Sequence, residues 1–437
     1  MNIAPRSKTS NRVTRRQMLK AGAAMLAAPA FVPSRLLGAD APSNRIAVAV
    51  IGCGGKAHGS TRQLKNLGGC EIVALADPNR VNLERYARDF AVPPDRCRQD
   101  FREVLSRNDV DAVLVGTPDH WHVPVSLAAA KAGKHIYCEK PLSNSIAEGQ
   151  ALVKAVHKAG VVFQHGTQLR SLAATRQACE LVRNGYLGNV RKVVVGSPPG
   201  HAVGDVPPAP VPKTLNWDMW VGPAPSMEYR SLIVGGIPGQ GLRGWYFMKR
   251  FSQAGWIAGY GVHDIDLAHW GLGLENTGPV RIEGRGEFPK SGLFDTVLGY
   301  ELTFTYADGR QIVMTDTGKN RHGVKFMHEN GKDWIHTRSG IDASDKRLLQ
   351  TPLKSTDQRL YASANHERNF AECIRKGTTK TITPIEVAHR STSVCLLGGI
   401  CLDLGRPLAW DPAAERFVND DEANARLDYQ HRQPWSV

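Results

Sequence analysis

The sequence predicts an α/β protein that begins with a doubly wound parallel sheet and continues with an α+β domain containing an open, mainly antiparallel sheet. Short apolar runs alternate with amphipathic stretches from residue 45 to about residue 165, as successive βαβ units do. Between residues 280 and 327, apolar and polar residues alternate, which is typical of strands with one covered face. A chain of 437 residues also exceeds one ordinary core, so two domains are expected.

The first domain is expected over residues 45–168. Its strands are predicted at residues 46–51, 72–76, 112–115, 135–138 and 161–164. Its helices are predicted near residues 57–67, 81–90, 101–107, 124–132 and 146–159. Gly133 and Gly160 stand where two of these helices should end, because glycine readily adopts the left-handed conformation of a helix C-terminus.

The second domain is expected over residues 169–405, with a helix at 171–184 and strands at 190–195, 280–287, 296–306, 310–315 and 324–327. Residues 196–259 are rich in Pro, Gly and Trp and have little period. So long an irregular segment is usually functional. Two later segments are predicted to be helices that return to the first domain, at 365–375 and 384–404. Residues 406–437 are predicted to form a polar tail.

Residues 1–39 are predicted to be a twin-arginine signal peptide. Thr14 to Lys20 carries the paired arginines, Ala21 to Ala30 is a short apolar stretch, and Leu37 to Ala39 offers a small-residue cleavage site. The apolar stretch is much shorter than the roughly 20 residues that span a bilayer, and no later segment qualifies. The predicted location is therefore the periplasm, with the twin-arginine export machinery as a partner. A disordered basic tail and an uncleaved anchor are the alternatives.

The net charge of +14 does not indicate a nucleic-acid partner. Seven of the 55 Lys and Arg residues, and none of the 41 acidic residues, lie in residues 1–39, so half of the excess belongs to the export segment. The remaining charge is dispersed and forms no pattern of a nucleic-acid groove. The eight cysteines include no C-x-x-C pair and no zinc-like spacing with histidine, so no metal site is expected.

A glycine-rich turn follows the first predicted strand and opens the first helix. Its glycines Gly52 and Gly54, with Gly55 beside them, allow a tight turn and a close approach of the backbone to a pyrophosphate, and Ala57 replaces the third glycine of the motif. Asp77 ends the next strand, where a carboxylate accepts hydrogen bonds from a ribose diol and repels a 2′-phosphate. The pattern predicts a Rossmann domain that binds NAD rather than NADP.

Two further motifs follow the predicted strands at residues 112–115 and 135–138. Thr117 to His122 (TPDHWH) fits a TPxxxH turn, and Glu139 to Pro141 is an EKP tripeptide. With the glycine-rich turn, they make the chain resemble the glucose–fructose oxidoreductase / inositol dehydrogenase / MocA (Gfo/Idh/MocA) family, from residue 45 to the C-terminal helices. The resemblance implies an NAD(P)-binding Rossmann domain and a C-terminal α/β domain whose open sheet often mediates oligomerisation, here in a homodimer or homotetramer.

The resemblance also implies a catalytic role for Lys140, which helps to bind the nicotinamide end and the reacting hydroxyl. A solvated surface lysine is the alternative interpretation. Gln168 and Arg170 follow the last strand of the first sheet and either contact nicotinamide or substrate or are solvated in a loop. The cofactor contacts expected beyond the glycine-rich turn and Asp77 are Thr117, Pro118, His120, His122, Glu139, Lys140 and Gln168.

Similar enzymes carry a second catalytic element, an Asp-x-x-x-His pair on the helix that enters the C-terminal domain. His263 matches this histidine, which accepts the hydroxyl proton, but Gly259 stands at the aspartate position. Without that carboxylate, the tautomer and basicity of the imidazole must be set by another group, for which Asp264 and Tyr260 are candidates. A helix-capping or core histidine is the alternative.

Aromatic residues crowd the irregular segment together with basic ones. Flat aromatic faces suit the apolar C–H faces of sugars, although such residues also build interfaces and cores. Trp245 and Tyr246 are the preferred substrate contacts, and Arg170, Tyr260 and Asp264 complete the predicted substrate site.

Together these features predict an exported NAD-dependent oxidoreductase of a sugar, polyol or glycoside. Lys140 positions the hydroxyl, His263 accepts its proton, and the cofactor stays tightly bound because the destination has no evident pool of free dinucleotide. Two alternatives remain open. One is redox-neutral, NAD-assisted cleavage of a glycoside through a transient keto-sugar, and the other is a non-catalytic sugar or nucleotide sensor.

Overall fold

The computed structural model describes residues 45–237, 239 and 241–435. The twin-arginine pattern and the expected cleavage site lie outside the described residues. Within the described part, no helix is both long and apolar enough to cross a membrane.

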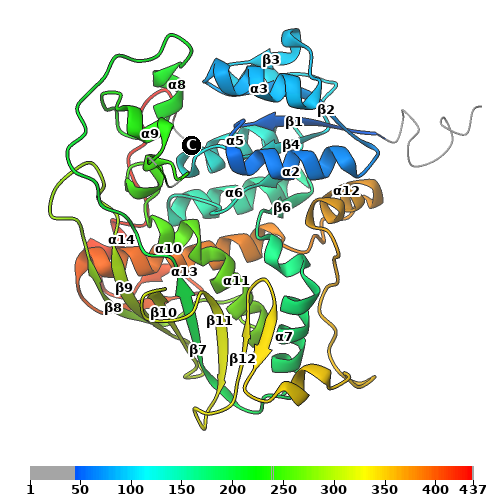
Figure 1. Cartoon of the computed structure of the whole chain (residues 1–437), viewed down its shortest axis with the longest axis vertical. Helices are drawn as coiled ribbons and strands as arrows, with labels where there is room; N and C mark the ends of the chain where they lie inside the picture. Colours follow the sequence, from blue (N-terminus) through cyan, green and yellow to red (C-terminus); the bar gives the residue numbers. More distant parts are fainter. Residues whose placement is uncertain (1–44, 238, 240, 436–437) are drawn as a thin grey trace, which may run out of the picture. The chain divides into compact units, whose positions relative to one another are not determined.

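The first sheet has six strands, all parallel, in the order β3-β2-β1-β4-β5-β6 (Figure 1). Its strands are β1 Ile46–Ile51, β2 Cys70–Ala76, β3 Cys97–Arg98, β4 Ala112–Val115, β5 His135–Cys138 and β6 Phe163–His165. The connecting helices are α2 Gly55–Asn66, α3 Arg80–Phe90, α4 Phe101–Leu105, α5 His122–Lys131 and α6 Ile146–Ala159. The predicted doubly wound parallel sheet is confirmed, and the short β3 is the strand that the sequence did not indicate.

Helices cover both faces of this sheet, so its strands are apolar on both sides. Along β1, Val48 and Val50 belong to one buried cluster with Leu83 of α3, whereas Ala49 and Ile51 belong to another with Leu152 of α6. The chain order reverses at β1, which lies between β2 and β4. At such a point the crevice beyond the carboxyl ends of the strands is where open α/β sheets bind ligands.

The second sheet has nine strands in the order β13-β12-β11-β7-β10-β9-β8-β14-β15. Its neighbours pair in antiparallel fashion except β7 and β10, which run parallel, as far as the described residues show. The predicted open, mainly antiparallel sheet is therefore confirmed. The strands are β7 Val190–Ser197, β8 Arg281–Glu287, β9 Gly299–Thr305, β10 Gln311–Asp316, β11 Gly323–His328, β12 Trp334–Thr337, β13 Ile341–Ala343, β14 Leu408–Asp411 and β15 Arg416–Phe417.

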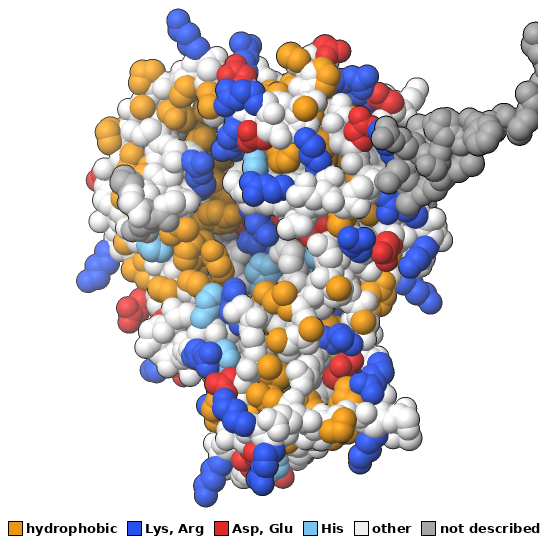
Figure 2. Space-filling view, turned by 45° about the vertical axis from the view of Figure 1, so that its right-hand side comes forward, with side chains coloured by type: hydrophobic (Ala, Val, Ile, Leu, Met, Phe, Trp, Pro, Cys, Tyr) orange, Lys and Arg blue, Asp and Glu red, His pale blue; other side chains and the backbone are white. Residues whose placement is uncertain are grey.

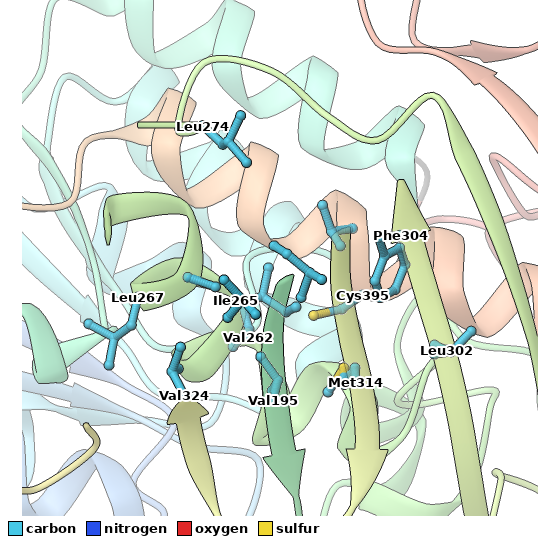
Figure 3. Close-up of a cluster of buried hydrophobic side chains, with 14 of the residues drawn as sticks. Val195, Val262, Ile265, Leu267, Leu274, Leu302, Phe304, Met314, Val324 and Cys395 are labelled. Atoms are coloured by element: carbon cyan, nitrogen blue, oxygen red, sulfur yellow. The ribbon is translucent and has the colours of Figure 1, made fainter. Parts of the chain in front are cut away.

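Three helices pack on this sheet, α7 Ala173–Arg183, α11 Gly261–Leu272 and α13 Ile385–Leu404. Figure 3 shows Val195 and Met314 of the sheet pointing toward Val262 and Ile265 of α11, with Cys395 of α13 beside them. These contacts with β7 and β10 hold α11 on the sheet, and they therefore fix the position of His263, which α11 carries.

The C-terminal helices tie the second domain to the first, as the sequence predicted. Phe370 of α12 (His366–Lys376) belongs to the buried cluster of Val48, and Ile385 of α13 belongs to the cluster of Ile51. Among its described residues, the irregular segment over residues 196–259 holds four short helical elements besides the end of β7 and its loops: α8 Trp217–Val221, α9 Ser231–Gly235, the 3-10 helix η6 Gly244–Phe247 and α10 Trp256–Gly259.

Residues 406–435 differ from the polar tail that the sequence suggested, and this expectation is corrected. They form β14, β15 and the short helix α14 (Asp421–Asn424), and Trp410 and Trp435 are buried. The ring of Trp435 packs edge-on against Trp121 at 5.2 Å between centroids. A polar composition concealed this because isolated aromatic side chains, rather than a periodic apolar face, carry the burial.

Candidate functional site

A cleft of about 880 Å³ lies at the carboxyl edge of the first sheet. One wall is made by the loops that follow β1, β2, β4 and β5, and the other by the irregular segment and the start of α11. In Figure 2 a hollow on the visible face brings apolar side chains together with Lys, Arg and His side chains, which matches the composition of this cleft.

The glycine-rich turn forms the floor of the cleft next to α2. Gly52 has φ of +88°, and a Cβ there would lie 2.4 Å from the backbone nitrogen of Thr117, so only glycine fits. A Cβ on Gly116 would lie 2.4 Å from the Cβ of Ala57, which shows how closely α2 approaches β4. Gly54 and Gly55 line the cleft at the N-terminus of α2, where free backbone N–H groups favour a phosphate.

Asp77 lies at the adenosine end expected for a dinucleotide, at the carboxyl end of β2. Its Oδ2 accepts a hydrogen bond from the Cys53 backbone nitrogen at 2.8 Å, and its Oδ1 accepts one from Asn79 at 2.8 Å. The Asn82 amide donates to both oxygens at 3.2 Å. Burial raises the pKa of the Asp77 carboxyl, and these hydrogen bonds oppose the rise. A fixed carboxylate here fits the ribose diol of NAD.

Lys140 lies at the other end of the cleft, just after β5. Its Nζ donates a hydrogen bond to the backbone oxygen of Gly259 at 2.6 Å and lies 5.6 Å from the ring centre of Tyr260 and 6.0 Å from that of Tyr246. Burial lowers the pKa of Lys140, whereas the negative charges of Glu139 and Asp119 raise it. The lysine is therefore held as a directed donor inside the cleft.

His263 of α11 lines the same end of the cleft. Burial, together with the positive charge of Lys140, holds the pKa of His263 well below its usual value, so the imidazole is neutral. Its Nδ1 is buried and has no hydrogen-bond partner among the described residues. A neutral imidazole can accept a proton from a ligand at the ring nitrogen that carries no hydrogen.

Gly259 stands where similar enzymes carry the aspartate of the Asp-x-x-x-His pair, so this chain offers only backbone atoms at that position. Gly259 offers its carbonyl to Lys140, and a Cβ there would already meet Trp256 at 3.2 Å. Of the two substitutes that the sequence suggested, Tyr260 lines the cleft. Asp264 is fully buried and faces His322 and Arg338 at 3.5 and 3.4 Å, outside the cleft lining.

The TPxxxH turn is bound to the EKP loop through His122. Its Nδ1 lies 2.6 Å from the Pro141 backbone oxygen and its Nε2 lies 3.0 Å from that of Thr117, and burial lowers the pKa of His122 to about 4. Thr117, Pro118 and His122 line the cleft. His120 points away from it, and its Nε2 lies 3.1 Å from the Trp220 backbone oxygen.

Two residues predicted near the nicotinamide lie behind the cleft lining. Gln168 donates to the hydroxyl of Tyr137 at 3.0 Å and to Glu139 at 3.2 Å, so it supports the glutamate that lines the cleft. Arg170 forms a buried ion pair with Asp266 at 2.7 Å. The direction of a loop side chain depends on such tertiary partners, which the sequence does not display.

Most aromatic residues of the irregular segment both line the cleft and pack in one buried cluster. Trp245 and Tyr246 stack with 3.7 Å between ring centres and both line the cleft, as does Trp256. Trp217 stacks on Trp220 at 5.0 Å, and Trp220, Trp245 and Trp256 belong to one buried cluster, of which all three also line the cleft. The sequence left both interpretations open for the set, and most of these rings serve both, since they border the cleft and pack in the same cluster.

Five charged residues line the cleft that the sequence did not single out as site residues: Lys56, Arg85, Asp119, Arg243 and Arg338. Asp119 lies inside the TPxxxH turn, so the motif already marked its position. Arg338 comes from the turn between β12 and β13, which no motif indicated. Within the described residues, no group of three or more His, Cys, Asp or Glu side chains is placed to hold a metal ion.

Comparison with known proteins places these features in a family. Residues 46–167 match the Gfo/Idh/MocA description "Oxidoreductase family, NAD-binding Rossmann fold", and residues 173–437 match "Oxidoreductase family, C-terminal alpha/beta domain". The scyllo-inositol 2-dehydrogenase (NAD(+)) of Bacillus subtilis is 23% identical over 356 residues, 78% of this chain and 90% of that protein.

Two further similarities are informative. Glycosyl hydrolase family 109 protein 1 of Shewanella sp. is 29% identical over 159 residues, 34% of each chain. The crystal structure of aldose-aldose oxidoreductase from Caulobacter crescentus with glycerol has a TM-score of 0.58 and 19% identity, and the match covers 84% of this chain and 99% of that one. The chain is an NAD-binding enzyme and belongs to the Gfo/Idh/MocA family of oxidoreductases.

Proposed function

We propose that this chain is an exported oxidoreductase that transfers a hydride between NAD and a sugar, polyol or glycoside and keeps the cofactor bound through turnover. The observation that carries the proposal is the single cleft that joins the diol-binding carboxylate Asp77 to Lys140 and His263. Residues 1–39, with their paired arginines, support export.

The residues of the cleft fit NAD. The turn at Gly52 and the N-terminus of α2 suit the pyrophosphate, and Asp77 suits the ribose diol. Lys56 and Arg85 also line the cleft and supply positive charge. When bound, NAD supplies a ring that accepts a hydride from the carbinol carbon of the substrate.

Lys140 and His263 carry the proton chemistry. Oxidation of a carbinol breaks its C–H and O–H bonds and forms a C=O bond. The proton goes to the ring nitrogen of the neutral His263 that carries no hydrogen. Lys140, held by the Gly259 carbonyl, donates a hydrogen bond to the reacting oxygen and fixes its position.

A second segment supports retention of the cofactor. Residues 212–216, which we call the clasp, cross to the loop after β2: the Arg80 backbone nitrogen donates to the Thr214 oxygen at 2.9 Å, and Asn216 donates to the Pro78 oxygen at 2.9 Å. Leu215 of the clasp lines the cleft. We expect these hydrogen bonds to slow the release of a dinucleotide held by Asp77.

The aromatic wall and the relatives support the substrate class. Trp245 and Tyr246 present stacked rings at the Lys140 end of the cleft, where the apolar face of a sugar or cyclitol can pack. Inositol and aldose are the substrates in the names of two similar proteins. A small polyhydroxylated substrate is consistent with both.

A second function is favoured by Gly259. The chain lacks the family aspartate there, and it is similar over one third of its length to a family 109 glycosyl hydrolase. Redox-neutral glycoside cleavage would oxidise a ring hydroxyl, eliminate the aglycone beside the new carbonyl, and return the hydride to the sugar. A retained cofactor suits this cycle because no net NADH is released.

Product analysis of the purified holoprotein separates the two. The protein is incubated without added NAD with scyllo-inositol, levoglucosan or a nitrophenyl glycoside, with Lys140→Met as the control. The proposed oxidoreductase forms bound NADH with the polyols, and the cleavage route releases nitrophenol without NADH. Protein that neither retains nor binds a pyridine nucleotide contradicts both.

A further inference from the structure

Three carboxylates line the cleft in the described part of the chain, and they differ in how their oxygens are used. Both oxygens of Asp77 accept hydrogen bonds. Glu139 Oε1 accepts from Ser60 and Gln168 at 3.2 Å, and its Oε2 is enclosed. Asp119 remains as the third, and its geometry is unlike that of the other two.

The side chain of Asp119 is 2% exposed, yet only one of its oxygens has a partner. Oδ2 accepts a hydrogen bond from the hydroxyl of Ser252 at 2.7 Å, while Oδ1 accepts none from any described residue. Oδ1 is not fully enclosed by protein, and Asp119 forms part of the cleft wall. A free carboxylate oxygen on a nearly buried side chain that borders the cleft points to a ligand.

The surroundings of Asp119 place it at the Lys140 end. It begins the turn η4 (Asp119–Trp121) after β4, and Ser252 reaches it from the loop before α10. The ionisable groups that interact with its charge are Lys140 and Cys138 at the end of β5 and Tyr246 of η6. Lys140 is therefore the positive charge whose field stabilises the ionised form of this carboxylate.

We infer that Asp119 is a third reaction-centre residue, whose free Oδ1 supplies beside Lys140 the negative charge and hydrogen-bond acceptor that Gly259 cannot supply. The inference rests on the proposed function only in placing a pyridine nucleotide in this cleft. Oδ1 would accept the hydrogen bond of a substrate hydroxyl and stabilise positive charge on the oxidised cofactor ring. Burial raises the pKa of Asp119 to about 7, so both effects strengthen above that pH.

The test compares the affinities of NAD⁺ and NADH, because the two differ by one positive charge on the ring and need no substrate. They are titrated into nucleotide-stripped wild type, Asp119→Asn and the control Asp95→Asn, an exposed exchange outside the cleft, at about pH 8 and pH 5.5. We expect Asp119→Asn to lower the preference for NAD⁺ at least about fivefold at the higher pH, with little change at the lower pH. Asp95→Asn should match wild type.

The possible outcomes are distinct. Wild type that binds neither nucleotide contradicts the proposed function. Normal binding with an unchanged NAD⁺/NADH preference in Asp119→Asn contradicts the inference alone. If Asp119→Asn does not fold, Ser252→Ala removes the bond that stabilises the charged carboxylate and should move the pH midpoint of the preference upward; an unmoved midpoint contradicts the inference.

A substrate from the holoprotein assay adds a second readout. Asp119→Asn should lower kcat by at least about 30-fold while NADH affinity changes less than about threefold, because the lost contact acts on the reacting end of the cleft. A purely structural role would weaken both nucleotides and substrate together.

Discussion

Replacing Asp119 with Asn should stabilise the protein at neutral and basic pH. Asp119 is buried, and burial raises its pKa from 3.8 to about 7, so the folded chain holds this proton more tightly than the unfolded chain does. A raised carboxyl pKa means that stability falls as the pH rises from about 4 through about 7. The asparagine amide keeps the shape of the carboxyl and its bond to Ser252 but carries no charge.

The magnitude follows from the pKa. Each unit of difference is worth about 1.4 kcal/mol, so the free energy of unfolding of Asp119→Asn, relative to wild type, should rise by about 3 kcal/mol between pH 5 and pH 8. Urea unfolding of nucleotide-free protein, followed by tryptophan fluorescence, measures this difference. Asp95→Asn is the matched control and should differ from wild type by less than about 0.5 kcal/mol at both pH values. A difference for Asp119→Asn that does not change with pH would refute the reasoning.

Three further changes test the cofactor end of the cleft. Gly52→Ala places a Cβ against backbone atoms at a φ of +88°, so it should lower the free energy of unfolding by at least about 3 kcal/mol and abolish nucleotide binding. The control Gly133→Ala, at a φ of +70° with open space around it, should lower it by about 1–2 kcal/mol. Thermal unfolding measures both. Asp77→Asn should lower the NAD/NADP affinity ratio by about 10-fold to 100-fold, since it removes a charged acceptor and the repulsion of a 2′-phosphate; equal weakening of both cofactors would oppose this. Gln99→Ala removes a 2.6 Å hydrogen bond to Pro78 beside the clasp and should speed NAD release by about twofold to tenfold in a displacement assay, so an unchanged rate would argue against the clasp.

Much of the first sheet was predictable because most of its strands are continuous apolar runs. β1, β4 and β5 are buried on both faces, and the turns that follow them carry Gly52, Thr117 and Lys140. Parallel strands end at one edge, so motifs far apart in the sequence converge there. His263 joins them because α11 packs on the second sheet.

Other features depend on tertiary contacts that leave no periodic signal. Trp410 and Trp435 are buried although they are isolated aromatic residues in a polar segment. The clasp forms through backbone hydrogen bonds, which any residue type can make. His120 contacts the Trp220 carbonyl and Arg170 pairs with Asp266, so neither side chain lines the cleft. The positions of these two residues in the sequence did not reveal these partners.

The most direct test of the central claim is the nucleotide content of freshly purified, folded protein. The account predicts close to one NAD or NADH released per chain on denaturation, held in the cleft between Asp77 and Lys140 and lost from Gly52→Ala. Protein that yields no pyridine nucleotide, and that takes up none when NAD is added, would contradict it.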